Sequence, residues 1–167
     1  MTQSIPEMVV RGRRRDLVGR QPEQPIRRTR RETAKVLSVV PLFAGFSKKD
    51  LDRLAEETDT VSFLPGQTVV EEGLLGETMF VVLSGEAKVT QGKRRLSMIR
   101  PGDFFGEVAL LDGAPRSASV VAETPLVAIR LFRRTLLRIL QAEPQLALKI
   151  LDVLVRRVRD QTRALDA

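Results

Sequence analysis

Glycine and proline divide the middle of the chain into short apolar segments. Between residues 60 and 131, runs of four to six residues rich in aliphatic side chains alternate with turn-forming positions. The turns fall at Pro65-Gly66, Gly73, Gly76, Ser84-Gly85, Gln91-Gly92 and Pro101-Gly102. Many short strands at this close, regular spacing are typical of a β-sandwich, a β-roll or a jelly roll. We predict strands at residues 61–64, 68–71, 79–83, 87–90, 95–99, 118–121 and 126–131.

Helical patterns flank this β region on both sides. An apolar run ends at Pro41, and Ser47 then caps a helix, with Asp50 three residues on in a capping-box arrangement. After residue 131 the apolar period is helical again. We predict one helix over residues 133–141 and a second that begins at Pro144 and runs to about residue 165. The expected fold class is therefore mainly β with flanking helices: a β-roll or jelly roll (double-stranded β-helix) with N-terminal helices and two C-terminal helices.

Two missing residue types exclude several kinds of site. The sequence contains no Cys and no His. This removes disulfides, thiol catalysis, histidine acid–base chemistry and the usual zinc and iron–sulfur sites. A jelly-roll enzyme of the cupin type needs His for its metal and is disfavoured for the same reason. No stretch is long and apolar enough to cross a bilayer, and residues 1–10 lack the layout of a secretory signal. We therefore expect a cytoplasmic protein that is not an enzyme.

The net charge of +7 is concentrated at the N-terminus. Residues 1–40 carry ten Arg or Lys against four Asp or Glu, whereas residues 41–167 carry eighteen against seventeen. We predict a disordered basic arm at residues 1–32 and one domain at residues 33–167, because the arm has few apolar side chains to bury. Such an arm can contact nucleic acid, an anionic membrane or an acidic protein through charge. The alternative is a leader that only keeps the protein soluble.

The most informative motif is PGDFFGEVALLDGAPRSASVVA, residues 101–122. It begins a short apolar helical segment directly after Gly106-Glu107 and ends it at Gly113. The free backbone N–H groups at a helix start favour an anion, and the guanidinium of Arg116 can donate paired hydrogen bonds to the same anion. The carboxylate of Glu107 suits a sugar hydroxyl. Together these groups predict a pocket for a nucleotide with an intact 2′-hydroxyl.

The segment FGEVALLDGAPRSASV resembles the phosphate-binding cassette of cyclic nucleotide-binding domains. These domains occur in bacterial cAMP receptor proteins, in the regulatory subunits of cAMP-dependent protein kinase and in cyclic nucleotide-gated channels. Two upstream segments extend the resemblance. PLFAGFSKKDLDRLA is similar to the family's N-terminal helices, and FLPGQTVVEEGLLGETMFVVLSGEAKV is similar to its first β-hairpins, including the glycine positions. The resemblance covers about residues 36–161.

The resemblance implies a role for each cassette residue. Glu107, next to Gly106, would accept a hydrogen bond from the ribose 2′-hydroxyl, and Arg116 would pair with the cyclic phosphate. Ser117 and the backbone N–H groups of Val108, Ala109 and Ala118 would complete the phosphate cradle. Strand residues would line the sugar and base from the β-roll wall, with a place in the core as the alternative for each: Val89, Leu96 and Ile99. The implied ligand is cAMP, and cGMP is the alternative.

The last helix carries two apolar stripes. One repeats at alternating spacings of four and three, as in a two-helix coil: Ala147, Leu151, Leu154, Val158, Gln161 and Leu165. The other consists of Leu146, Ile150 and Val153 and can pack on the β-roll. The first stripe predicts a homodimer through residues 144–165. The alternative is one wide stripe that faces the core.

The end of this helix also bears on the ligand. Counted without gaps from Arg116, the position where cAMP receptor proteins offer a threonine to adenine falls on Gln161, and Thr162 follows. We therefore expect Gln161 and Thr162 to close over the base. Six residues follow Gln161, which is too few for the helix-turn-helix of the transcription-factor relatives, so specific DNA binding is not expected.

The leading hypothesis is a regulatory sensor that binds cAMP and signals to a partner through its C-terminal helix. The alternative is a scaffold tethered to nucleic acid or membrane by the basic arm.

Overall fold

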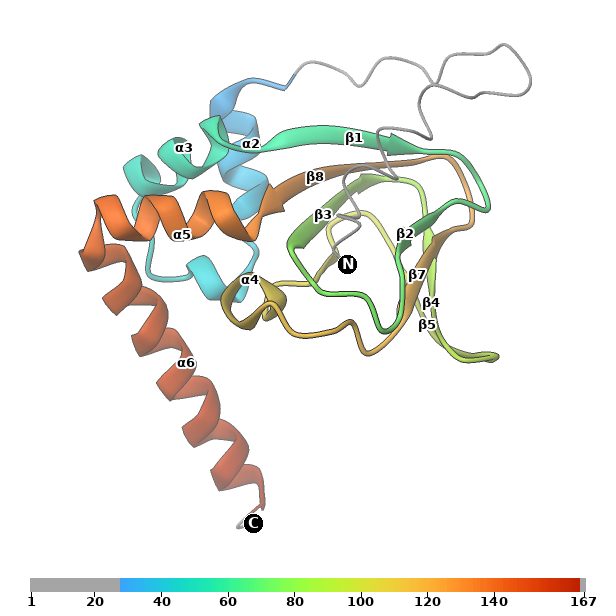
Figure 1. The fold of residues 1–167 in the computed structure, drawn as a ribbon. Helices are drawn as coiled ribbons and strands as arrows, with labels where there is room; N and C mark the ends of the chain where they lie inside the picture. Colours follow the sequence, from blue (N-terminus) through green and yellow to red (C-terminus); the bar gives the residue numbers. More distant parts are fainter. Residues whose placement is uncertain (1–27, 166–167) are drawn as a thin grey trace.

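The computed structural model describes residues 28–165, which form two antiparallel β-sheets with helices packed beside them (Figure 1). The four-stranded sheets have the orders β1-β8-β3-β6 and β2-β7-β4-β5. This architecture confirms the predicted β-roll, with helices that precede and follow the strands in the chain. In chain order the elements are α2 (Arg30–Leu37), η1 (Pro41–Phe43), α3 (Lys48–Glu56), β1 (Asp59–Phe63), β2 (Thr68–Val70), β3 (Thr78–Ser84), β4 (Ala87–Gln91), β5 (Arg94–Ile99), β6 (Phe104–Phe105), α4 (Ala109–Asp112), β7 (Ser119–Ala122), β8 (Leu126–Phe132), α5 (Arg133–Ala142) and α6 (Pro144–Leu165).

All seven predicted strands are present, as β1–β5, β7 and β8. Each predicted boundary lies within two residues of the observed one. Strand β6, whose two phenylalanines pair with Phe80 and Val81 of β3, was not predicted. Two residues are too few to show the alternation of apolar and polar side chains that identifies a strand.

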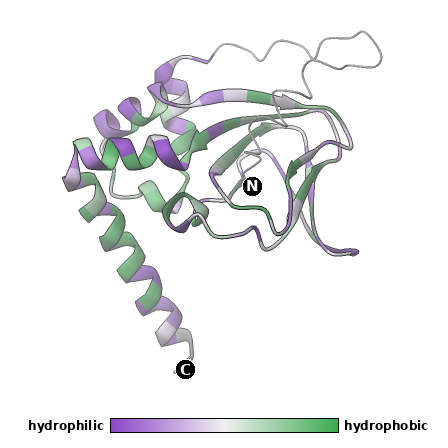
Figure 2. Cartoon of the chain, viewed as in Figure 1, coloured by the Kyte–Doolittle hydropathy of each residue, from purple (hydrophilic) through white to green (hydrophobic). Residues whose placement is uncertain are grey.

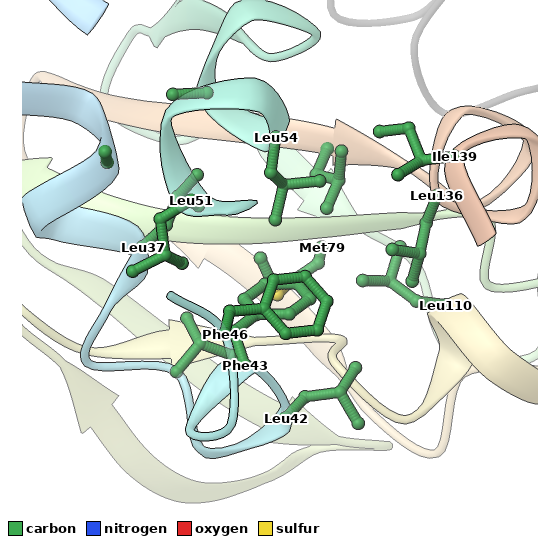
Figure 3. Packing of buried hydrophobic residues seen from close by; sticks show 14 of the residues in the cluster. Leu37, Leu42, Phe43, Phe46, Leu51, Leu54, Met79, Leu110, Leu136 and Ile139 are labelled. Carbon is green, nitrogen blue, oxygen red and sulfur yellow. The ribbon is translucent and has the colours of Figure 1, made fainter. Parts of the chain in front are cut away.

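The central strands β3 and β8 are buried on both faces. Met79 and Val81 of β3 pack with Ile129 of β8 in the cluster that the helices cover. Figure 3 shows this cluster, in which Met79 lies among side chains from α2, η1, α3, α4 and α5. Phe80 and Val82 point to the opposite face and form the interior of the roll. Burial on both faces explains the continuous apolar run in β3.

Capping boxes start both N-terminal helices. Ser47 caps α3 through the amide of Asp50, as predicted. Thr29 caps α2 in the same way with Glu32, so this helix begins at Arg30, three residues before the expected start of order at Thr33. Residues 1–27, and with them most of the predicted basic arm, lie outside the described residues.

The two C-terminal helices begin at the predicted residues, Arg133 and Pro144. The first half of α6 is anchored to the domain. Leu146 and Ile150 are buried against the helical core, and Lys149 Nζ forms an ion pair with Asp50 of α3 at 2.7 Å. Within the described residues, no helix is long and apolar enough to span a bilayer.

The second apolar face of α6 differs from the predicted stripe. Figure 2 shows apolar residues along the helix as it extends away from the roll. Its exposed members are Leu148, Leu151, Val155 and Val158. The predicted stripe shares only Leu151 and Val158 with this set, since Leu154 packs partly against the core and Ala147 is half-buried. The side chain of Leu165 lies outside the described residues. The exposed seam therefore has Leu148 and Val155 in place of Ala147 and Leu154, because the core already covers that side of the predicted stripe.

Candidate functional site

A cavity of about 390 Å³ opens where the cassette meets the inner face of the sheet β2-β7-β4-β5. The strands contribute only apolar residues to its wall, and all of its polar lining residues come from the segment that surrounds α4. Its lining residues are Val70, Val89, Ile99, Phe105, Gly106, Glu107, Val108, Ala109, Asp112, Ala114, Pro115, Arg116, Ser117, Ala118 and Val120.

Arg116 brings a buried positive charge to this cavity, since only 8% of the residue is exposed. Its Nη2 donates to the carbonyl oxygen of Thr78 at 2.5 Å and to Thr78 Oγ1 at 3.0 Å. Among the described residues, the guanidinium makes no hydrogen bonds other than these two. Its buried Nε therefore has no partner. Burial away from water lowers the pKa of Arg116 to about 10. At neutral pH the cavity therefore holds a desolvated cation whose Nε has no hydrogen-bond partner.

Two glycines make room for this guanidinium. At Gly106 the backbone φ is +82°, and a Cβ would lie 2.5 Å from Arg116 Nη1 and 2.6 Å from the Thr78 carbonyl oxygen. At Gly76 a Cβ would lie 2.6 Å from the Ala109 Cβ and 3.2 Å from Arg116 Nε. No larger residue fits at either position without moving the arginine or α4.

Glu107 supplies a buried carboxylate to the same cavity. The residue is 7% exposed. Its Oε1 accepts a hydrogen bond from Arg157 Nη1 of α6 at 2.9 Å, while its Oε2 is buried without a partner. A buried carboxylate oxygen without a donor carries a large desolvation cost. The free Oε2 is therefore a ready acceptor for a hydroxyl group.

Backbone amides border the cavity at the start of α4 and before β7. Among the backbone hydrogen bonds of the described residues, none uses the N–H groups of Val108, Ala109, Ser117 or Ala118. Gln91 Nε2 donates to the Ser117 carbonyl oxygen at 3.1 Å, which ties this loop to β4. The cavity thus combines one cation with unused amide donors, an arrangement suited to an anion.

The structure brings most of the predicted site residues together. Nine of the twelve line the cavity: Val89, Ile99, Gly106, Glu107, Val108, Ala109, Arg116, Ser117 and Ala118.

The other three predicted residues lie elsewhere. Leu96 is 45% exposed and is absent from the cavity lining. In the pairing of β5 with β4, Val89 is opposite Ser97 and Thr90 is opposite Arg95, so Leu96 has no partner residue and lies at a β-bulge. Gln161 and Thr162 are exposed on the distal part of α6 and do not line the cavity either. The hydroxyl of Thr162 instead donates to the Val158 carbonyl oxygen of its own helix. The structure therefore does not bring Leu96, Gln161 or Thr162 to the cavity, and their contacts with a ligand stay predictions.

Three polar residues at the site were not predicted: Thr78, Asp112 and Arg157. Thr78 and Arg157 meet their partners across 38 and 50 residues of sequence, respectively. A single sequence carries no signal for such long-range contacts. Asp112 lies inside the cassette, where its position between Glu107 and Arg116 was the available clue.

Comparison with known proteins agrees with this geometry. The sequence profile of the cyclic nucleotide-binding domain matches residues 60–143, about half of the chain. The chain belongs to the cyclic nucleotide-binding domain family.

Two proteins and one solved structure illustrate the relationship. The cGMP-dependent protein kinase of Toxoplasma gondii is 37% identical over 109 residues, which are 65% of this chain and 11% of the kinase. The cAMP-dependent protein kinase regulatory subunit of Aspergillus fumigatus is 37% identical over 113 residues, 66% of this chain and 27% of the subunit. The regulatory domain of Toxoplasma gondii cAMP-dependent protein kinase, solved with cAMP, has a TM-score of 0.62 and 26% identity, covering 78% of this chain and 50% of that chain. The chain therefore spans about a quarter or less of these two proteins and half of the solved domain.

Proposed function

We propose that the chain binds a cyclic nucleotide, with cAMP as the first candidate, in the cavity between the cassette and the β-roll, and that it acts as a regulatory module without catalysis. The observation that carries the proposal is the pairing of two incomplete polar groups in one cavity. Arg116 is a buried cation with unused donors, and Glu107 is a buried carboxylate with an unused oxygen. A cyclic phosphate and a ribose hydroxyl on one small molecule complement both.

Each residue then has one role in the proposed complex. Arg116 pairs with the phosphate, and the hydroxyl of Ser117 and the amides of Val108, Ala109 and Ala118 complete its hydrogen bonds. Glu107 accepts from the 2′-hydroxyl through Oε2. The apolar wall packs on the sugar and the base: Val70, Val89, Ile99, Phe105 and Val120. This wall has no base-specific hydrogen-bonding side chain, so cGMP remains the alternative ligand.

We propose that Arg157 connects the ligand to α6. Its ion pair with Glu107 joins the expected ribose acceptor directly to the C-terminal helix. A 2′-hydroxyl that donates to Glu107 Oε2 adds a second hydrogen bond to the carboxylate whose other oxygen Arg157 contacts. Ligand binding therefore has a physical route to the position of α6, which is what a sensor requires.

We propose that the partner at the exposed seam of α6 is a second copy of the chain. Leu148, Leu151, Val155 and Val158 are spaced by three, four and three residues, which is the repeat of a two-stranded coiled coil. The same seam on a second molecule is its simplest complement. A cytoplasmic location, also expected from the sequence, stays a prediction.

Calorimetric titration with cAMP, cGMP and a cyclic dinucleotide tests the binding proposal. We expect Arg116→Ala to lower cAMP affinity at least tenfold, because a charge-assisted pair with a partly buried phosphate contributes about 1.5–3 kcal/mol. The matched control is Arg100→Ala, since Arg100 has an exposed side chain and lies outside the cavity lining. Unchanged affinity in a folded Arg116→Ala variant would contradict the proposal.

The pH dependence gives an independent check on Arg116. Its pKa of about 10 means that the guanidinium is fully charged at neutral pH and loses its proton as the pH rises through 10. The phosphodiester stays anionic throughout. We expect cAMP affinity to be constant near neutral pH and to fall as the pH rises above about 10, because the bound phosphate raises the pKa of Arg116, so that the complex keeps a proton that the free protein loses.

The basic arm is the basis of the alternative function. Removing residues 1–27, which leaves the capping residue Thr29 in place, separates the two hypotheses. A binding module keeps its cAMP affinity after this truncation. A scaffold that acts through the arm loses its binding to nucleic acid or anionic vesicles and shows no cAMP binding in either form.

A further inference from the structure

Asp112 places a second carboxylate in the cavity, in addition to Glu107. It is the last residue of α4 and lines the cavity. Its Oδ1 accepts a hydrogen bond from the Ala114 amide at 2.9 Å, which fixes the side chain beside the turn that leads to Arg116. Asp112 is exposed, and none of the ion pairs among residues 28–165 includes it. The guanidinium of Arg133, which lies beside Gly113, donates to the Leu111 carbonyl oxygen.

The charges at the cavity therefore balance before any ligand binds. Glu107 is neutralised by Arg157, and the remaining charges are Arg116 and Asp112. A volume of 390 Å³ corresponds to a sphere about 9 Å across, which is close to the screening length of about 8 Å at physiological ionic strength. A phosphate held by Arg116 thus experiences the field of Asp112 and is repelled in proportion to its own charge.

Resting on the proposed function, we propose that Asp112 is a specificity-determining residue that disfavours phosphomonoesters relative to cyclic phosphodiesters. A cyclic phosphodiester carries one negative charge. A 5′-monophosphate carries nearly two at neutral pH, because its second pKa lies near 6. Because the monoester carries almost one more negative charge than the cyclic ligand, the carboxylate of Asp112 repels it more strongly and weakens its binding more.

The test is the substitution Asp112→Asn, which removes the charge and keeps the Oδ1 acceptor for the Ala114 amide. Affinities for cAMP and 5′-AMP are measured by calorimetry on the full chain at about 10 mM ionic strength, where the screening length is roughly 30 Å. For charges roughly 6–9 Å apart in a water-like dielectric, a range that the width of the cavity allows, each ligand charge corresponds to a roughly two- to threefold change in affinity. We expect the ratio of cAMP to 5′-AMP affinity to fall by roughly two- to threefold in Asp112→Asn at pH 7.5.

A change of pH isolates the charge of the ligand. At pH 5, 5′-AMP is mostly a monoanion, so the same substitution should leave the affinity ratio unchanged. Glu123→Gln is the matched control, because Glu123 is an exposed carboxylate outside the cavity lining. It should leave the ratio unchanged at both pH values. A second readout is salt: the difference between wild type and Asp112→Asn should vanish near 1 M NaCl.

The outcomes separate this inference from the proposed function. If wild type binds cAMP and Asp112→Asn changes both affinities equally, or neither, the role of Asp112 is overturned while the binding site stands. If wild type binds neither nucleotide, the proposed function itself fails. Should Asp112→Asn prove unstable, Asp112→Ser, which also removes the charge and keeps a short acceptor, gives the same comparison.

Discussion

Thr78 controls the direction in which Arg116 offers its hydrogen bonds. It is fully buried at the first position of β3 and holds Nη2 through two oxygens. This contact fixes one end of the guanidinium and leaves Nη1 and Nε for a ligand. The hydroxyl of Thr78 is therefore a positioning group for the proposed phosphate contact.

We expect Thr78→Val to weaken cAMP binding several-fold, because the side chain keeps its shape but loses the acceptor at 3.0 Å. The carbonyl contact remains, so the loss should be smaller than for Arg116→Ala. Thr78→Ser, which retains the hydroxyl, should restore the affinity. Calorimetry with adenosine, which has no phosphate, distinguishes positioning from general disruption. Adenosine affinity that falls in parallel with cAMP affinity would contradict the positioning role.

The sequence predicted the elements well where local chemistry specifies them. Gly and Pro turns placed the strands, Pro144 placed the start of α6, and Ser47 with Asp50 placed α3. Order was expected only from residue 33, because the basic composition of residues 27–31 obscured the Thr29 and Glu32 capping box that starts α2. For the site, Glu107 and Arg116 came from one contiguous motif. Thr78 and Arg157 depend on packing between distant elements, which a sequence pattern does not specify.

The exposed seam of α6 gives a prediction about assembly. We expect Val155→Glu to convert a dimer to a monomer, because two carboxylates would meet at the centre of the paired helices. Val155 is preferred over Leu154, whose side chain packs partly against the helical core, so that a change there would disturb the domain as well.

Light scattering across a concentration series measures this effect. Arg163→Glu is the control, since it introduces the same group at an exposed position outside the seam. It should leave the dimer intact. If the wild-type chain is monomeric even at high concentration, a second copy of the chain is not the partner of α6.

At the scale of the whole molecule, α6 is held at two places. Near its start, Leu146 and Ile150 are buried and Lys149 pairs with Asp50. Burial acts to raise the pKa of Asp50, but the hydrogen bonds from Lys149 and Ser47 together lower it. This anchor is therefore ionised at neutral pH and weakens only as the pH falls through that lowered pKa. Further along, the contact between Arg157 and Glu107 joins the helix to the cavity.

A ligand shifts the balance between two arrangements of α6 only if it interacts differently with them. In the proposed complex the ion pair of Arg157 with Glu107 supplies that difference, because the ribose hydroxyl would bind the other oxygen of the same carboxylate. We expect cAMP to change hydrogen exchange both in residues 105–120 and in residues 144–163 of the wild-type chain. In Arg157→Met the change should stay within residues 105–120, while Arg159→Met, an exposed arginine two residues away, should behave as wild type. If cAMP changes hydrogen exchange only in residues 105–120 of the wild-type chain, the domain binds cAMP without altering α6. The proposed route from the ligand to a partner, which runs through α6, would then be wrong.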